Sequence, residues 1–498
     1  MISFEFSTIS LITSTSWYWT LFQVLLFVEV IFAIIYHCII YPYGNRRTKA
    51  PKFRDHGKYR HMLMIQVMNR MRRTWCQNGE SFEPIFKKFM RTYFLRDPSY
   101  TNQEKKDEKE ENSLLQGDID DFMAWGFFFK RIHELVDWER EEMKVMYDIM
   151  AKDYGVSFKP GKTPGIKACL MNVDEVNALW RPLLVYVMFF FVNSSGRLWM
   201  RYCGFQFFLT KNGLGYWYRP ERSRNNEDKS FDSSKQLPLL FFHGISPGGL
   251  TIYLPMLLYG MSSSGRAAFY FENPPITCAL SFKALTEEET CNGVLEALNT
   301  HLHKDKKVII AGHSFGSCQI SWLLHSPVSQ RIHQLLLLDP VSILLCYPDT
   351  MQNFLYKFLL ENPITMNFQD QCVRYMVSTE IGVEHYLRRR VAWYNSELFF
   401  ETVPDSIQVT VCLSGKDNIV NASSVKKEVV LTNEIRLKSL RQNCGNIENG
   451  KVKTRQVELI YWPEDGHGQC LFMRRSWNDL EKSITRQDHV YSKSLKLS

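Results

Sequence analysis

No CxxC pair and no cysteine–histidine spacing of the zinc-binding type occurs in this sequence, although it contains 12 cysteines. Zinc ribbons and zinc fingers depend on such spacings, so neither is expected. The cysteines are scattered, and several lie inside apolar runs, namely Cys278, Cys318 and Cys412. This pattern is typical of buried free thiols and favours a reducing compartment. We expect neither a metal site nor a cofactor.

A strong basic excess is also missing. The net charge is +8 over 498 residues, and the basic side chains do not alternate with aromatic ones along a stripe. Nucleic acid is therefore not the expected partner, and a membrane surface suits the charge better. A hydrophobic fraction of 45% and a charged fraction of 22% are typical of a folded chain, long enough here for one large core and an additional unit.

Lys and Arg are absent from residues 1–16, and nearly continuous apolar sequence follows at residues 17–41. About 20 apolar residues suffice to cross a bilayer, and Trp and Tyr residues stand at both ends of this run, as at membrane interfaces. Basic residues crowd its C-terminal flank: Arg46, Arg47, Lys49, Lys52, Arg54, Lys58 and Arg60. These flanks predict a single-pass anchor within residues 1–44, with the remainder of the chain on the cytoplasmic side.

Two other interpretations of the apolar run exist. A cleaved signal peptide is disfavoured because the run is too long, no basic residue precedes it and no small-residue cleavage site follows. A buried helix of a soluble domain stays open, because Glu29 is costly in lipid unless it is protonated or has a partner.

Residues 45–235 are expected to form a helical accessory region. Apolar positions recur at helical spacing in residues 75–95 and 122–151, and the charged run between them, 102–112, is typical of a linker. An aromatic-rich stretch at 183–209 is interrupted by polar residues at 193–197, and its ten leading apolar residues are too few to span a bilayer. Core packing and contact with one membrane leaflet are equally open for this stretch.

From residue 237 the sequence changes to short apolar runs that alternate with segments of helix length, which is typical of a parallel sheet buried on both faces. The expected strands are 237–242, 267–271, 307–311, 334–338, 408–413 and 457–461. We place the boundary of this catalytic domain in the polar run that ends near residue 235, and the domain itself at 236–484.

The third of these strands runs into Gly312-His313-Ser314-Phe315-Gly316 and then into a helix-like segment. This is the strand, sharp turn and helix of a nucleophile elbow, whose crowded backbone requires glycine on both sides of the serine. Such a pentapeptide also arises by chance, but its position directly after a buried strand favours Ser314 as a nucleophile.

A serine nucleophile needs a base and a carboxylate that orients the base, and on this type of sheet they follow in the order serine, acid, histidine. Asp417 comes directly after the strand at 408–413, and His467 follows the strand at 457–461. Taken singly, these residues could be a turn aspartate and a loop histidine. Asp339, at the end of the strand at 334–338, is the alternative acid.

The first strand leads into a glycine-rich turn at residues 243–249. Such a turn allows a backbone N–H to face the active centre, and we nominate the N–H groups of Ile245 and Phe315 as the oxyanion hole. A phosphate-cradling loop is the competing use of these glycines, but no Lys-Ser or Lys-Thr follows them.

The motifs that carry a family resemblance are FFHGISPGG, IIAGHSFGS, LLLLDP, LSGKDNIVN and EDGHGQ. In them the chain resembles the α/β-hydrolase superfamily, and especially its membrane-attached eukaryotic serine hydrolases of the AB hydrolase-1 type. The resemblance implies an eight-stranded, mostly parallel sheet with a helical cap at about residues 341–404, followed by a C-terminal tail at 485–498. The polar stretch 433–456 looks like an insertion between the acid and the histidine.

These features together predict a serine hydrolase that cleaves carboxylic esters through Ser314, His467 and Asp417. The anchor and the aromatic stretch favour a lipid or another hydrophobic ester as substrate, with the bilayer as the second partner. Two alternatives remain: a membrane scaffold that has lost turnover, and an acyltransferase that uses the same serine.

Overall fold

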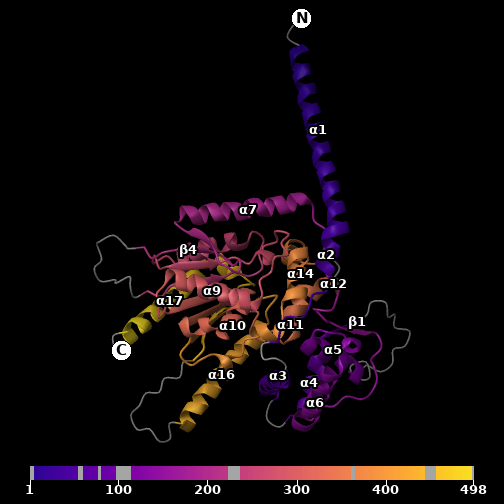
Figure 1. Cartoon of the computed structure of the whole chain (residues 1–498), viewed down its shortest axis with the longest axis vertical. Helices are drawn as coiled ribbons and strands as arrows, with labels where there is room; N and C mark the ends of the chain where they lie inside the picture. Colours follow the sequence, from indigo (N-terminus) through magenta and orange to yellow (C-terminus); the bar gives the residue numbers. More distant parts are fainter. Residues whose placement is uncertain are drawn as a thin grey trace.

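The fold is described from a computed structural model of the chain. The structure describes residues 5–53, 60–76, 80–96, 114–222, 236–360, 365–443 and 456–495. Figure 1 shows a long helix, α1 (Glu5–Ile35), that projects away from a body built around one sheet.

The sheet has eight strands in the order β10-β9-β8-β7-β5-β6-β4-β3. Neighbouring strands are parallel from β10 to β6, and β4 and β3 complete the sheet as antiparallel strands. The strands are β3 (Gln206–Leu209), β4 (Gly215–Arg219), β5 (Leu239–Phe242), β6 (Ala268–Phe271), β7 (Val308–His313), β8 (Ile332–Leu338), β9 (Gln408–Ser414) and β10 (Glu458–Trp462). The expected mostly parallel eight-stranded α/β sheet is confirmed.

The central strands are apolar without interruption because both of their faces are covered. In β5, Leu240 and Phe242 belong to one buried cluster, while Leu239 and Phe241 belong to another. Successive side chains of a strand point to opposite faces, so this division places a separate core on each side of the sheet. All of β5, β6, β7 and β8 is buried.

The sheet begins earlier in the chain than the expected boundary near residue 235. Strands β3 and β4 come from the range assigned to the helical accessory region, and they form a hairpin on the edge of the sheet. Asn212 and Gly213 lie in the turn between them, and Gly213 has a φ of +85°. Asn-Gly between aromatic runs is a hairpin signal, and the helical assignment of the whole region passed over it.

Residues 183–202 form one continuous helix, α7 (Leu183–Tyr202), rather than a stretch broken at 193–197. Asn193, Ser194 and Ser195 are poor helix formers, but only Gly196 is a helix breaker by backbone freedom. Gly196 is buried, and a side chain there would collide with Thr251, so tertiary packing explains the glycine.

The accessory helices pack against the segment inserted between β8 and β9. They are α3 (Arg60–Trp75), α4 (Phe82–Arg91), α5 (Gln116–Phe128) and α6 (Asp137–Tyr154), and a small antiparallel pair joins β1 (Phe94–Arg96) to β2 (Ile166–Ala168). The inserted segment is helical, as expected of a cap, and contains α11 (Pro348–Met351), α12 (Lys357–Leu360), α13 (Phe368–Cys372), α14 (Ile381–Arg390) and α15 (Trp393–Ser396). Figure 1 shows α4, α5 and α6 gathered on the other side of the body from α7.

Two long helices complete the catalytic part, α16 (Ala422–Asn443) and α17 (Arg474–Leu495). Helix α17 continues through most of the range expected to be a tail, and its Asp488 is bound by the buried guanidinium of Arg266. Of the expected insertion at 433–456, residues 444–455 lie outside the described residues. The amide of Asn433 and the backbone of Val457 exchange two hydrogen bonds, of 2.9 and 2.8 Å, which hold the two ends of the insertion together.

Candidate active site

Ser314 lies on a sharp turn between β7 and α10 (Gly316–Leu324), in a left-handed backbone conformation with a φ of +51°. A non-glycine residue in this region is strained and persists only where its surroundings hold it. Neither flanking glycine tolerates a side chain: a Cβ at Gly312 would lie 2.9 Å from the backbone of Gly316, and a Cβ at Gly316 would collide with the carbonyl of Phe242. The local geometry is that of a nucleophile elbow.

The structure brings Ser314, His467 and Asp417 into one line. The Oγ of Ser314 lies 3.0 Å from Nε2 of His467, and Nδ1 of the same ring lies 2.7 Å from Oδ2 of Asp417. The other oxygen of Asp417 accepts hydrogen bonds of 2.8 Å from the N–H groups of Ile419 and Val420. With Nδ1 protonated, Nε2 is free to accept the hydroxyl proton of the serine.

The electrostatics of the site favour this arrangement. Burial alone lowers the pKa of His467, but the adjacent Asp417 carboxylate outweighs it and raises the pKa of His467 above its ordinary value. Burial lowers the pKa of His313 well below its ordinary value, with His467 and His243 adding to the effect. The two rings lie 5.2 Å apart, so a neutral His313 leaves His467 as the proton-accepting ring of the pair.

Asp339 lies beneath this line of residues and is fully buried. One of its oxygens accepts a 2.8 Å hydrogen bond from the N–H of Ser414, and the other accepts bonds of 2.9 Å from the Ser414 hydroxyl and 3.0 Å from the N–H of Gly468. Asp339 therefore joins the loop after β9, which carries Asp417, to the loop that carries His467. Asp339 was predicted as the alternative acid and does lie close to His467, but its hydrogen bonds go to Ser414 and Gly468.

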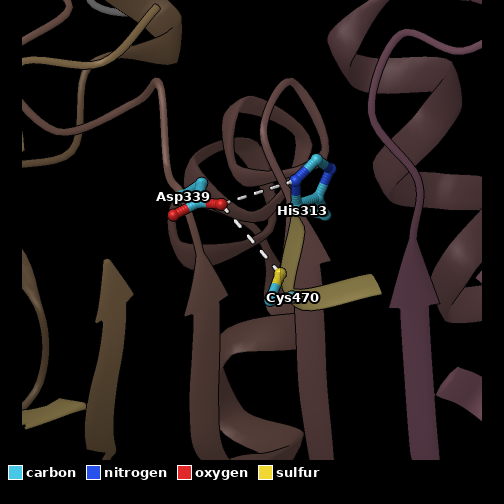
Figure 2. A group of neighbouring side chains, drawn as sticks. All are labelled: His313, Asp339 and Cys470. Atoms are coloured by element: carbon cyan, nitrogen blue, oxygen red, sulfur yellow. Dashed lines mark hydrogen bonds and ion pairs between the residues drawn. The ribbon is translucent and has the colours of Figure 1, made fainter. Parts of the chain in front are cut away.

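Figure 2 shows one oxygen of Asp339 facing both His313 and Cys470, near the ends of the strands. The Nε2 of His313 lies 3.9 Å from Asp339, and the Sγ of Cys470 lies 4.0 Å from it. Burial raises the pKa of Asp339 to about 6 and raises the pKa of the Cys470 thiol well above its ordinary value.

Two sets of side chains in this region have the composition of metal ligands, His313 with Asp339 and Cys470, and Asp339 with Asp417 and His467. In each set the ligand atoms lie within 4.8 Å of one another. The carboxylates of Asp339 and Asp417 already accept hydrogen bonds from backbone N–H groups on the oxygens that a cation would bind. The donor chemistry therefore fits a hydrogen-bonded network better than a cation.

The glycine-rich turn after β5, which leads into the short helix η4 (Gly249–Tyr253), approaches Ser314 closely. A Cβ at Gly244 would lie 2.9 Å from the Cβ of Ser314, so only glycine allows the turn to come this near. The hydroxyl of Tyr253 accepts a 2.9 Å hydrogen bond from the N–H of Gly244 and lies 3.0 Å from Nδ1 of His313. Tyr253 therefore fixes the turn relative to the elbow.

The nominated oxyanion-hole residues, Ile245 and Phe315, both line the cavity into which Ser314 opens. Phe315 directly precedes α10, where helix N–H groups have no partner within the helix and the dipole favours negative charge. Their role as N–H donors to an oxyanion stays a prediction.

The cavity has a volume of about 360 Å³ and an almost wholly apolar lining. Besides Ser314 and His467, it is lined from the accessory helices by Met64, Met68, Met71, Met90, Met123 and Met150. Methionine is flexible and polarisable, and it adapts to irregular apolar ligands. The accessory region thus forms one wall of the candidate active site.

Several residues of the site were not identified from the sequence. Tyr253 and Cys470 gave no signal, since neither belongs to a motif. The methionines did give one, because Met64, Met68 and Met71 stand three and four residues apart on α3, as one face of a helix does. That face was not associated with a site 250 residues further along the chain.

No family model matches the chain, and no curated protein matches its sequence. Similar solved structures include the carboxylesterase CesB from Bacillus subtilis, at 11% identity and a TM-score of 0.37, covering 60% of this chain and 98% of that one. A bacterial membrane phospholipase A matches at 11% identity and a TM-score of 0.37, covering 63% of this chain and 94% of that one. An esterase from Pyrococcus furiosus matches at 12% identity and a TM-score of 0.36, covering 57% and 90%. Likenesses this distant carry no argument about activity, and the fold stands on the chain's own sheet order and elbow.

Proposed function

We propose that this chain, which has the α/β-hydrolase fold, is a membrane-anchored serine hydrolase that cleaves carboxylic esters of acyl lipids. The observation that carries the proposal is the hydrogen-bonded line from Ser314 through His467 to Asp417, 3.0 and 2.7 Å long, on a strained elbow that opens into an apolar cavity.

In the proposed reaction His467 accepts the hydroxyl proton of Ser314 while the serine oxygen attacks the ester carbonyl. The negative charge that develops on the carbonyl oxygen is stabilised by the N–H groups of Phe315 and Ile245 and by the N-terminus of α10. The protonated His467 then gives its proton to the leaving alcohol. Water, deprotonated by His467, attacks the acyl-enzyme, and the carboxylic acid leaves as the serine regains its proton.

The lipid preference is supported by the cavity. Its lining offers methionine, phenylalanine and leucine side chains and few polar groups beyond those of the site itself, so it suits an acyl chain and offers little to a sugar or a charged head group. This argument concerns the acyl part of the substrate only.

Reaction with a fluorophosphonate probe tests the catalytic proposal. The full-length protein in detergent is expected to be labelled, and Ser314→Ala is expected to show no labelling while it keeps the wild-type thermal unfolding midpoint. A folded wild-type protein that does not react would instead favour the scaffold.

Turnover of a labelled acyl lipid with and without an acceptor alcohol separates hydrolysis from acyl transfer. Formation of a new ester in place of the free acid would overturn the proposal of a hydrolase.

The anchor is supported by contacts that a cleaved segment would lose. Glu29 of α1 accepts hydrogen bonds of 2.8 and 3.0 Å from the N–H groups of Leu183 and Leu184, and Tyr36 is completely buried. The helix from Phe32 onward packs one face against Val176 and Tyr186, so the part of the apolar run that is exposed on all sides ends before Phe32. In sealed microsomes, added protease is expected to digest the catalytic part, and its protection would contradict the cytoplasmic placement.

A further inference from the structure

The outer face of α7 is apolar although it is exposed. Most of its exposed apolar side chains recur at the spacing of one helical face, and Phe190 is exposed on the flank of that face. The residues of the face are Leu184, Val187, Met188, Phe191, Leu198 and Tyr202. Their exposed fractions run from 38% at Val187 to 90% at Tyr202. Soluble proteins rarely present a continuous apolar surface of this length, and such surfaces mark a site of contact with another molecule or with lipid.

The orientation of this face is fixed by the packing of the opposite one. Phe189, Gly196 and Met200 are buried on the inner side of α7. The carbonyl of Val192 accepts a 3.2 Å hydrogen bond from the Thr251 hydroxyl, and a side chain at position 196 would collide with Thr251. The helix therefore cannot rotate to bury its outer face without losing these contacts.

Helix α7 is joined to α1 at the point where α1 leaves the body. Glu29 lies in the middle of an apolar helix, and its carboxylate caps the N-terminus of α7 through the N–H groups of Leu183 and Leu184. Figure 1 shows α7 running crosswise to α1 along the side of the body from which α1 projects. These hydrogen bonds fix the N-terminus of α7 at the position of Glu29 along the axis of α1.

That level divides α1 into two parts. Toward the N-terminus, the side chains from Trp17 to Val28 are exposed, and the helix from Glu5 to that point is about 36 Å long at about 1.5 Å per residue, enough for a hydrocarbon core of about 30 Å. Toward the C-terminus, one face of the helix is buried in the body through Phe32 and Tyr36, while Ile31, Ile34 and Ile35 stay exposed on the other face. The contact of α1 with the body therefore begins at the level of Glu29, which is the level at which α7 lies.

We propose that α7 lies in the membrane–water interface with its outer apolar face against the lipid of the leaflet that α1 enters. The occupant is lipid rather than a protein because the exposed surface of α7 continues that of a helix long enough to cross the bilayer. Trp180, three residues before α7, and Tyr202, at its end, are exposed aromatic residues of the kinds that favour the interface. The choice between core packing and leaflet contact for this stretch is thus resolved by face: the inner side packs, and the outer side meets lipid.

Photocrosslinking of the full-length protein in phosphatidylcholine vesicles tests this. A benzoylphenylalanine placed at Phe191 is expected to form adducts with radiolabelled phosphatidylcholine as readily as one placed at Leu25 of α1. The matched control is Trp138, which is 55% exposed on α6, across the body from α7, and is expected to give several-fold less lipid adduct.

Adduct formation at Phe191 no higher than at Trp138, with Leu25 still labelled, would overturn the proposal. A crosslinked dimer of the chain in place of the lipid adduct would also overturn it, since a second copy would then cover the face. Because the readout needs no turnover, its result is separate from that of the fluorophosphonate test.

Discussion

Asp417 and Asp339 are two buried carboxylates close to His467, and their hydrogen bonds give them different roles. Asp417 bonds directly to the Nδ1 of His467, whereas Asp339 bonds to Ser414 and Gly468, which flank the loops that carry Asp417 and His467. Asp417 is therefore the expected orienting acid, and Asp339 is expected to position the loops.

Asp417→Asn is expected to lower kcat by about 10³- to 10⁴-fold, because an amide at this place favours the wrong tautomer of His467. Asp339→Asn should lower kcat much less, since it leaves the Asp417–His467 bond in place. Ester hydrolysis by both variants measures the difference. If Asp339→Asn proved the more damaging variant while folded, the alternative acid would be the correct one.

The pH dependence follows from the raised pKa of His467. The serine reacts only when His467 is neutral, so kcat/KM should fall as the pH drops through this pKa, and the acidic limb should lie above the ordinary histidine value of about 6.5. Loss of the Asp417 charge lowers the pKa of His467, so Asp417→Asn should move the limb to lower pH while its residual activity is still measurable. A limb that does not move would show that another group controls it.

At the scale of elements, a buried ion-pair cluster joins the accessory helices to the catalytic part. Arg70 of α3 is 2% exposed and pairs with Glu397, which follows α15, and at 3.1 Å with Glu428 of α16. Its guanidinium also lies 4.1 Å from the centre of the Phe399 ring. The side chain of Arg70 thus links α3, α16 and the segment after α15.

Arg70→Met is expected to destabilise the protein by about 3–5 kcal/mol, because it leaves the buried Glu397 carboxylate without a counter-charge, whereas Glu428 keeps its pair with Arg73. Arg47→Met is the control, since the Arg47–Glu134 pair is exposed and should contribute only about 0–1 kcal/mol. Denaturant unfolding of both variants in detergent, followed by tryptophan fluorescence, gives the free energies. Equal losses for the two variants would contradict the structural role of the buried cluster.

At the scale of the whole molecule, the candidate active site is shared between the two halves of the chain. The sheet positions Ser314, Asp417 and His467, and the accessory helices supply much of the apolar wall. We therefore expect the accessory region to influence which acyl chain is accepted, without taking part in the chemistry.

Met68→Trp is expected to lower kcat/KM for long-chain esters and to leave that for an acetyl ester nearly unchanged, because the larger side chain fills part of the cavity. Met62→Trp is the matched control: it changes the same residue type on the same helix at a position that is 47% exposed. The ratio of the two kcat/KM values for each variant is the measurement. An unchanged ratio in Met68→Trp would mean that the acyl chain binds elsewhere.

Local patterning was sufficient for the six parallel strands and for the choice of candidate residues, but not for the β3–β4 hairpin. Uninterrupted apolar strands, glycines around Ser314, and an aspartate and a histidine at later strand ends are short-range features, because backbone crowding and two-sided burial act over a few residues. For the same reason the six expected strands agree with the observed ones to within two residues at each end.

Tertiary packing was needed for everything that depends on which distant segments meet. Nothing near Glu29 in the sequence indicates that it caps α7, and nothing near Met68 indicates that it lines a cavity with Ser314. The different roles of Asp339 and Asp417 are seen only in their hydrogen bonds to segments that follow other strands. These contacts span 50 residues or more, and their partners are chosen by the packing of whole elements and not by the residues beside them. The proposed lipid-facing side of α7 also depends on tertiary structure, because only the packing shows which side of the helix is buried and which is exposed.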